Sequence, residues 1–97
     1  MKTNNILDLL PFDGIKTAKV ISNSSGNVIL ISIEQGKELT EHKSNTDASV
    51  LVLEGVVKFK INGESYDLLP NDTFDFKKDE LHAIEAVTNA KLILIKG

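Results

Sequence analysis

Two histidines, His42 and His82, are the residues of this 97-residue chain best suited to chemistry near neutral pH. An imidazole exchanges a proton close to pH 7 and is the commonest nitrogen ligand for metal ions in proteins. The two residues lie 40 positions apart, on different predicted strands. Any joint role therefore requires a fold that brings the two strands together.

The composition excludes several other kinds of chemistry. The chain has no cysteine, which removes disulfides, thiolate metal sites and cysteine nucleophiles. All 11 cationic residues are lysines, set against 14 acidic ones, so neither a basic nucleic-acid footprint nor an arginine fork is present. The chain lacks the long uncharged apolar run that would indicate a membrane span or a secretory signal. We expect a cytoplasmic protein with no nucleic-acid or membrane partner.

Short apolar segments separated by turn residues fill most of the chain. Asn62-Gly63 is a strong hairpin signal because both central residues of a type I′ turn need a positive φ. Before Pro11 the chain allows at most a short helical turn. Nine or so short strands at such spacing favour an all-β sandwich or barrel. The predicted strands are 16–22, 28–33, 37–44, 49–53, 56–61, 64–69, 73–76, 82–87 and 91–95.

The glycines and the first histidine resemble the first motif of the cupin superfamily. That motif reads Gly, five residues, His-x-His, three or four residues, Glu, six residues, Gly. Laid over this chain, it begins at Gly36, places its two histidines at His42 and Ser44, its carboxylate at Ala48 and its closing glycine at Gly55. Alternation along a strand puts positions 42 and 44 on the same face.

The second histidine fits the second cupin motif, which reads Gly, five residues, Pro-x-Gly, two residues, His, three residues, Asn. Here it would begin at Asn71, pass Lys77 and Asp79 where the family has Pro and Gly, reach His82 and end at Ala86. The resemblance spans about residues 28 to 96. It implies an all-β, double-stranded β-helix (jelly roll) barrel with a single cupin-like domain, residues 1–97.

The ligand set departs from the family at two of four positions. In cupins the two histidines and the glutamate of the first motif and the histidine of the second motif bind one metal ion inside the barrel. Ser44 is a poor ligand and Ala48 has no donor atom. A divalent transition metal usually takes three or four protein ligands. We therefore predict no cofactor beyond a weakly bound divalent metal at the partial set His42 and His82.

The resemblance then implies a small-molecule binding protein without classical metal catalysis, acting as a sensor or accessory domain. His42, Ser44 and His82 are the predicted ligand-binding residues in an otherwise apolar cavity, and no catalytic residue is assigned. Two alternatives stay open. One is an enzyme, either a metal-dependent oxygenase or isomerase with an incomplete ligand set or a metal-free acid–base catalyst using His42 or His82. The other is a purely structural or protein-binding domain.

Two predicted strands, 28–33 and 92–95, carry apolar residues on both faces. Because the outer face of a two-sheet sandwich normally meets water, these strands need a second covering. We expect the N-terminal segment, residues 1–14, to pack on the barrel or on a dimer partner and to supply part of that covering. A second copy of the chain supplies the rest, which predicts a homodimer.

Overall fold

Nine strands and one short 3₁₀ helix form the computed structural model, which describes residues 5–43 and 45–96. No helix in these residues has the length and apolar character needed to cross a membrane. In chain order the elements are η1 (Ile6–Asp8), β1 (Ile15–Asn23), β2 (Gly26–Ile33), β3 (Glu38–His42), β4 (Ala48–Glu54), β5 (Val57–Ile61), β6 (Glu64–Leu68), β7 (Thr73–Phe76), β8 (His82–Ala86) and β9 (Ala90–Lys96).

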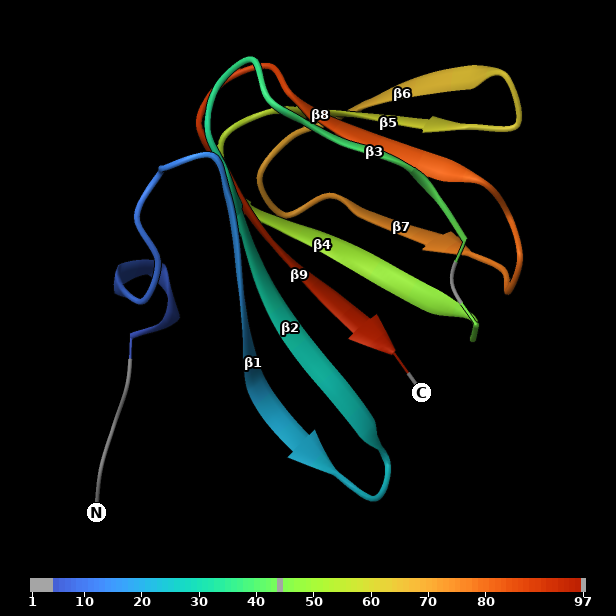
Figure 1. The fold of residues 1–97 in the computed structure, drawn as a ribbon, viewed down its shortest axis with the longest axis horizontal. Helices are drawn as coiled ribbons and strands as arrows, with labels where there is room; N and C mark the ends of the chain where they lie inside the picture. The colour runs from blue at the N-terminus through green and yellow to red at the C-terminus, as the bar shows by residue number, and fades with distance from the viewer. Residues whose placement is uncertain (1–4, 44, 97) are drawn as a thin grey trace.

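The strands form two antiparallel sheets that face each other (Figure 1). Sheet A has the order β1-β2-β9-β4-β7, and sheet B has the order β3-β8-β5-β6. Strands that are distant in sequence are neighbours in both sheets, for example β2 beside β9 and β3 beside β8. This arrangement is the jelly roll that the sequence predicts.

Turn chemistry explains where the central hairpin reverses. Asn62 and Gly63 both have positive φ, 52° and 77°, so the predicted two-residue hairpin between β5 and β6 is confirmed. Its register pairs Ile61 with Glu64 and Phe59 with Tyr66. Asp79, where the second cupin motif has glycine, also has a positive φ of 68°. The β7–β8 connection thus keeps a left-handed backbone position without the glycine that usually occupies it.

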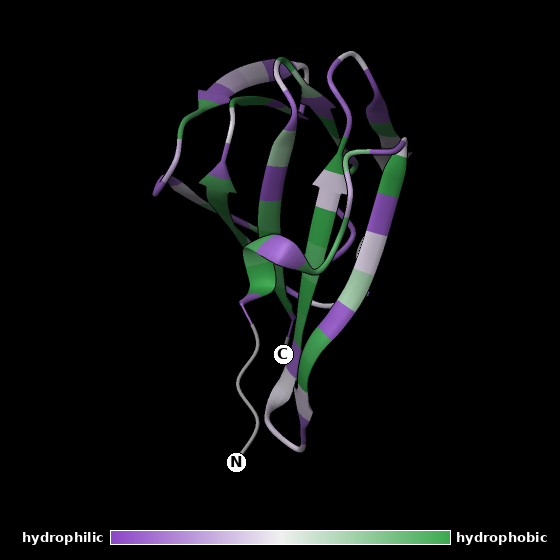
Figure 2. Cartoon of the chain, turned by 90° about the vertical axis from the view of Figure 1, so that its left-hand side faces the viewer, coloured by the Kyte–Doolittle hydropathy of each residue, from purple (hydrophilic) through white to green (hydrophobic). Residues whose placement is uncertain are grey.

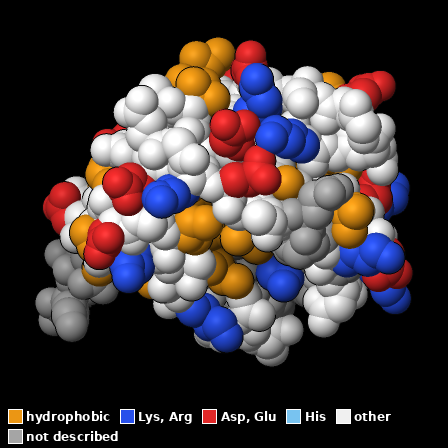
Figure 3. All heavy atoms as spheres, turned by 45° about the horizontal axis from the view of Figure 1, so that its top comes forward, with side chains coloured by type: hydrophobic (Ala, Val, Ile, Leu, Met, Phe, Trp, Pro, Cys, Tyr) orange, Lys and Arg blue, Asp and Glu red, His pale blue; other side chains and the backbone are white. Residues whose placement is uncertain are grey.

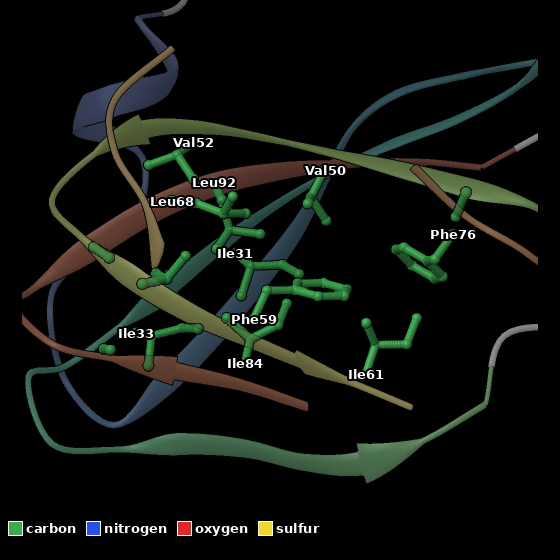
Figure 4. Packing of buried hydrophobic residues seen from close by; sticks show 14 residues of the cluster. Ile31, Ile33, Val50, Val52, Phe59, Ile61, Leu68, Phe76, Ile84 and Leu92 are labelled. Atoms are coloured by element: carbon green, nitrogen blue, oxygen red, sulfur yellow. The ribbon is translucent and has the colours of Figure 1, made fainter. Parts of the chain in front are cut away.

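The core lies between the two sheets and is built from alternate residues of their strands. β4 and β5 both show strict alternation of buried and less buried positions, as expected for strands with one face on a core. Figure 4 shows Phe59 reaching into the middle of this core, with Ile61 and Phe76 toward one end. Phe59 is fully buried and stacks on Phe74, with their ring centroids 4.6 Å apart.

The N-terminal segment packs across the outer face of sheet A, on the side of the molecule that Figure 2 presents to the viewer. The Ser32 hydroxyl donates to the Pro11 carbonyl at 2.8 Å, and the ammonium of Lys91 donates to the carbonyl of Leu7. Gly14 N–H donates to the carboxylate of Glu34 at 2.9 Å. These contacts cover part of the outer face of β2 and β9, the strands that are apolar on both sides.

The outer face of sheet B is charged, in contrast to sheet A. Lys60 lies 2.6 Å from a carboxylate oxygen of Glu38 and 3.2 Å from one of Glu85. Figure 3, which brings this side of the molecule forward, shows acidic and basic side chains next to one another. Hydrogen bonds to Glu38, and then to Glu85, raise the pKa of Lys60 above its ordinary value. This face also carries a hollow of about 360 Å³, with Glu38, Lys60 and Ala83 in its lining.

The β1 edge of sheet A is irregular. β1 pairs with β2 on one side only, and its register shifts between Lys19 and Ile21. The extra residue at this shift is Val20, which makes the site a β-bulge. Lys16 and Lys19 are both exposed along this strand.

Candidate functional site

The fold brings the backbones of the two histidines together. β3 and β8 are antiparallel neighbours, and His42 is the register partner of His82, after a register shift between Leu39 and His42. The structure places His42 by its backbone alone, and Ser44 lies outside the described residues. The part of the predicted site that the structure describes in full is therefore His82.

The ring of His82 is held inside the barrel. It is 2% exposed and lies between two aromatic rings, with centroids 5.7 Å from Phe59 and 4.2 Å from Phe76. Its Nδ1 is 2.9 Å from the carbonyl oxygen of Glu80. Because a carbonyl only accepts hydrogen bonds, Nδ1 carries the proton in this contact. The orientation of the imidazole and the site of its proton are thus both set by the protein.

The donor set does not fit the metal ion that the cupin resemblance implies. Ala48, at the position of the family's glutamate, faces the core and contributes only a methyl group. Ala86, at the position of the family's asparagine, is likewise buried. Among the side chains that the structure describes, which leave out those of Glu41 and His42, no group of three or more His, Cys, Asp or Glu is arranged to hold a metal. Accordingly, we derive no chemistry that passes through a metal.

A hollow of about 240 Å³ opens at the mouth of the barrel, between the β5–β6 hairpin and β7. Phe74 and Tyr66 form an aromatic wall, with ring centroids 5.0 Å apart. Glu64 and Glu80 line the same hollow, and the Tyr66 hydroxyl donates to Glu64 at 2.5 Å. This contact with the carboxylate raises the pKa of Tyr66. The hollow is therefore apolar on one side and acidic on the other.

A continuous series of rings joins this hollow to the buried histidine. Tyr66 contacts Phe74, Phe74 stacks on Phe59, and Phe59 lies parallel to His82 within 5°. A larger hollow of about 440 Å³ exists where β4 and β7 meet, with Ser49 and Ile95 in its lining. The larger hollow also reaches His82, through Phe76, whose ring lies 4.2 Å from the imidazole. We assign the site to the smaller hollow because two aromatic rings, Tyr66 and Phe74, line it, whereas Phe76 is the one aromatic residue in the lining of the larger.

Loop residues at the mouth are connected by two carboxylates. Glu80 accepts from the Lys77 N–H and from the Asn62 side chain, both at 2.7 Å. Asp47 accepts from the Lys78 N–H at 2.9 Å. The Lys77 N–H, and then the Asn62 amide, lower the pKa of the Glu80 carboxyl. Glu80 is therefore ionised at neutral pH and fixed in place.

Two residues of the smaller hollow, Tyr66 and Glu80, are not among the site residues that the sequence predicts. The tyrosine was accessible to prediction, because a two-residue hairpin at Asn62-Gly63 places Tyr66 opposite Phe59. The contact of Glu80 with Asn62 could not be predicted in this way, because it joins two turns whose separation in space depends on the whole barrel. Phe59, Phe74 and Phe76 lie in or against the core.

Comparison with known proteins agrees with this geometry. The family model of the AraC-like ligand binding domain matches residues 27–94, and the chain belongs to this family. No curated protein matches the chain. The fold and the inward-facing histidine together define a small cupin domain.

Solved cupin structures share this fold. An RmlC-like cupin from Desulfovibrio desulfuricans has a TM-score of 0.86 at 23% identity, with 98% of this chain and 94% of that chain covered. A cupin superfamily protein from Desulfitobacterium hafniense DCB-2 has a TM-score of 0.84 at 20% identity, covering 94% and 84% of the two chains.

Cupin enzymes are also similar in fold. The DMSP lyase from Ruegeria pomeroyi DSS-3 has a TM-score of 0.79 at 18% identity, with 88% of this chain and 48% of the lyase covered. At this identity the likeness extends to the fold alone.

Proposed function

We propose that this chain binds a small organic molecule at the mouth of its barrel, without the metal ion of classical cupin enzymes. The observation that supports this most directly is the aromatic series from the hollow at Tyr66 and Phe74 to the buried ring of His82. Apolar walls with a few oriented polar groups are the usual profile of a small-ligand site. Membership of a ligand-binding family supports the same function.

The groups in and around the hollow suggest a division of roles. Tyr66 and Phe74 provide area for stacking, while Asn62 and Glu80 provide hydrogen-bonding groups at the rim. His82 and His42 are proposed to orient a polar part of the ligand from the barrel side, together with Ser44. In this proposal the domain serves as a sensor or accessory unit, because its residues bind and orient without providing a complete catalytic set.

Thermal-shift screening tests the proposal. A panel of carboxylic acids, sugars and aromatic amines is added to the purified protein, and each compound that raises Tm is titrated by calorimetry. We expect a variant with both His42→Ala and His82→Ala to lose that binding, and a Ser49→Ala control in the larger hollow to retain it. Binding that survives the double substitution would overturn the site assignment.

The metal-dependent enzyme is the alternative that a separate measurement addresses. The protein is refolded in defined salts that contain zinc, iron or manganese, and its metal content is determined. Stoichiometric metal would favour an oxygenase or isomerase, whereas a metal-free protein that still binds a compound supports the proposal.

A second copy of the chain is proposed to cover the lower part of sheet A. Ile21, Val28 and Ile95 are register partners across three strands, and Ile21 and Ile95 are 54% and 43% exposed. They continue the apolar outer face that the N-terminal segment covers near Ser32 and Lys91.

The proposed function includes the cytoplasmic location predicted from the sequence, which cell fractionation tests.

A further inference from the structure

The β7–β8 connection, residues 77–81, leads directly into His82, whose ring is buried. It joins the end of β7 to the start of β8 at the same end of the molecule as the β5–β6 hairpin and the start of β4 (Figure 1). The carbonyl of Glu80 in this connection is the hydrogen-bond partner of His82 Nδ1. A displacement that moves the Glu80 carbonyl therefore breaks one of the contacts that orient the imidazole, alongside its ring contacts with Phe59 and Phe76.

Hydrogen bonds link the connection to itself and to its neighbours. Within it, Glu80 N–H donates to the Lys77 carbonyl at 3.2 Å and closes a turn that has Asp79 at a positive φ. Outside it, the Glu80 carboxylate accepts from Asn62 of the hairpin on one side. On the other side, Lys78 N–H donates to Asp47, just before β4. The side chains of Lys77, Lys78 and Asp79 are exposed.

We propose that residues 77–81 form a lid over the barrel mouth, closed by two carboxylate clasps, Glu80 to the hairpin and Asp47 to the lid backbone. Breaking either clasp lets the lid lift from its neighbours and exposes His82 and the inner rings, while the sheets remain paired. The lid gives the ligand of the proposed function a route to His82, and in this respect the inference rests on that function. Glu80 and Asp47 are positioning residues in this scheme, since both act through the lid.

The geometry favours a lid over a rigid wall for a physical reason. Both clasps are exposed hydrogen bonds, which contribute far less than the burial of a core strand. Openings that break only a few exposed hydrogen bonds lie at the low end of the local-unfolding scale. The lid is therefore expected to open without unfolding of the barrel.

The test measures access to His82 directly and needs no ligand. The native protein is treated with diethyl pyrocarbonate, and the rate of modification at His82 is followed by peptide mass spectrometry. We expect a slow rate in the unaltered protein and a rise of about tenfold in Asp47→Ala, which loses one hydrogen bond to a charged group. Glu80→Ala loses two, from the Lys77 N–H and the Asn62 side chain, and should show at least as large a rise. Circular dichroism and thermal unfolding verify that each variant is folded.

Two further variants keep the result interpretable. Glu64→Ala removes a carboxylate from the same hollow, but its partner Tyr66 lies on the same strand, so we expect a rate within about twofold of the unaltered protein. Glu80→Gln retains one acceptor oxygen, so we expect its rate of modification at His82 to lie between those of the unaltered protein and Glu80→Ala. It serves in place of Glu80→Ala if that variant does not fold. Unchanged rates in the folded clasp variants would refute the lid, as would an equal rise in Glu64→Ala. A failed ligand screen would leave these rates unaffected and would bear only on the proposed function.

Discussion

The ammonium of Lys91 lies 4.8 Å from the centroid of the Phe12 ring and donates to the carbonyl of Leu7. Lys91 is only 5% exposed, so a strand residue of sheet A holds the N-terminal segment by a buried cation. Cation–π contacts of this kind contribute more when they are shielded from water.

Replacing this cation is expected to loosen the segment and leave the barrel intact. In Lys91→Met the apolar length is kept, while the hydrogen bond and the cation–π contact are lost. We predict faster hydrogen exchange in peptides that cover residues 5–14, with little change in β4 or β5. Lys96→Met, on the same strand, is the matched control, and equal exchange in the two variants would contradict the anchor role of Lys91.

Lys60 provides a pH-dependent contribution to stability. Its pKa is raised in the folded protein by Glu38 and Glu85, so the stabilisation is fully present below the ordinary value of 10.5. It is lost as the pH rises through the higher folded pKa. We predict that the difference in Tm between the unaltered protein and Lys60→Met shrinks through this alkaline range. Lys58→Met on the same strand is the control, and a difference independent of pH would argue against the linkage.

Gly55 is predicted to tolerate no side chain. Its φ is +79°, and a Cβ there would lie 2.0 Å from the carbonyl oxygen of Asn89. Because both the conformation and the backbone contact oppose alanine, Gly55→Ala should cost more than about 3 kcal/mol and lower Tm by more than about 10 °C.

Gly36→Ala separates the two causes of that loss. Gly36 also has a positive φ, +84°, but a Cβ there meets no atom within 4 Å. We expect it to cost only about 1 kcal/mol by thermal unfolding. Similar losses at both glycines would mean that the approach of Asn89 to Gly55 is unimportant.

The proposed dimer predicts a strong effect at Ile95. Ile95→Lys places a charge in the apolar row with Ile21 and Val28, and should raise the dimer dissociation constant by at least about tenfold. Leu81→Lys is the control, because Leu81 has the same 43% exposure but lies in the β7–β8 connection. Sedimentation velocity at micromolar concentration measures both. A monomeric unaltered protein would remove the proposal.

Sequence patterns were sufficient for the fold because they are local. The Asn62-Gly63 turn and the alternation in β4 and β5 each depend on a few neighbouring residues, and the structure reproduces them. The spacing of Gly36 and His42 carried the family resemblance, which the family model supports.

The site was less accessible to sequence reasoning because it depends on contacts between distant turns. Sequence alone placed His82 near His42, and their strands are paired. It gave no sign that Glu80 would bond to Asn62, or that Tyr66 would begin a series of rings ending at His82. The tertiary packing of the barrel, which no short-range pattern records, determines these relationships.

The bulge at Val20 also affects how copies of the chain can meet. A long, regular outer strand offers unpaired N–H and C=O groups on which another chain can continue the sheet, a route toward fibrils. In β1 the bulge disrupts that template, and Lys16 and Lys19 add like-charge repulsion between approaching copies. Open-ended strand addition is thereby disfavoured at this edge of the molecule.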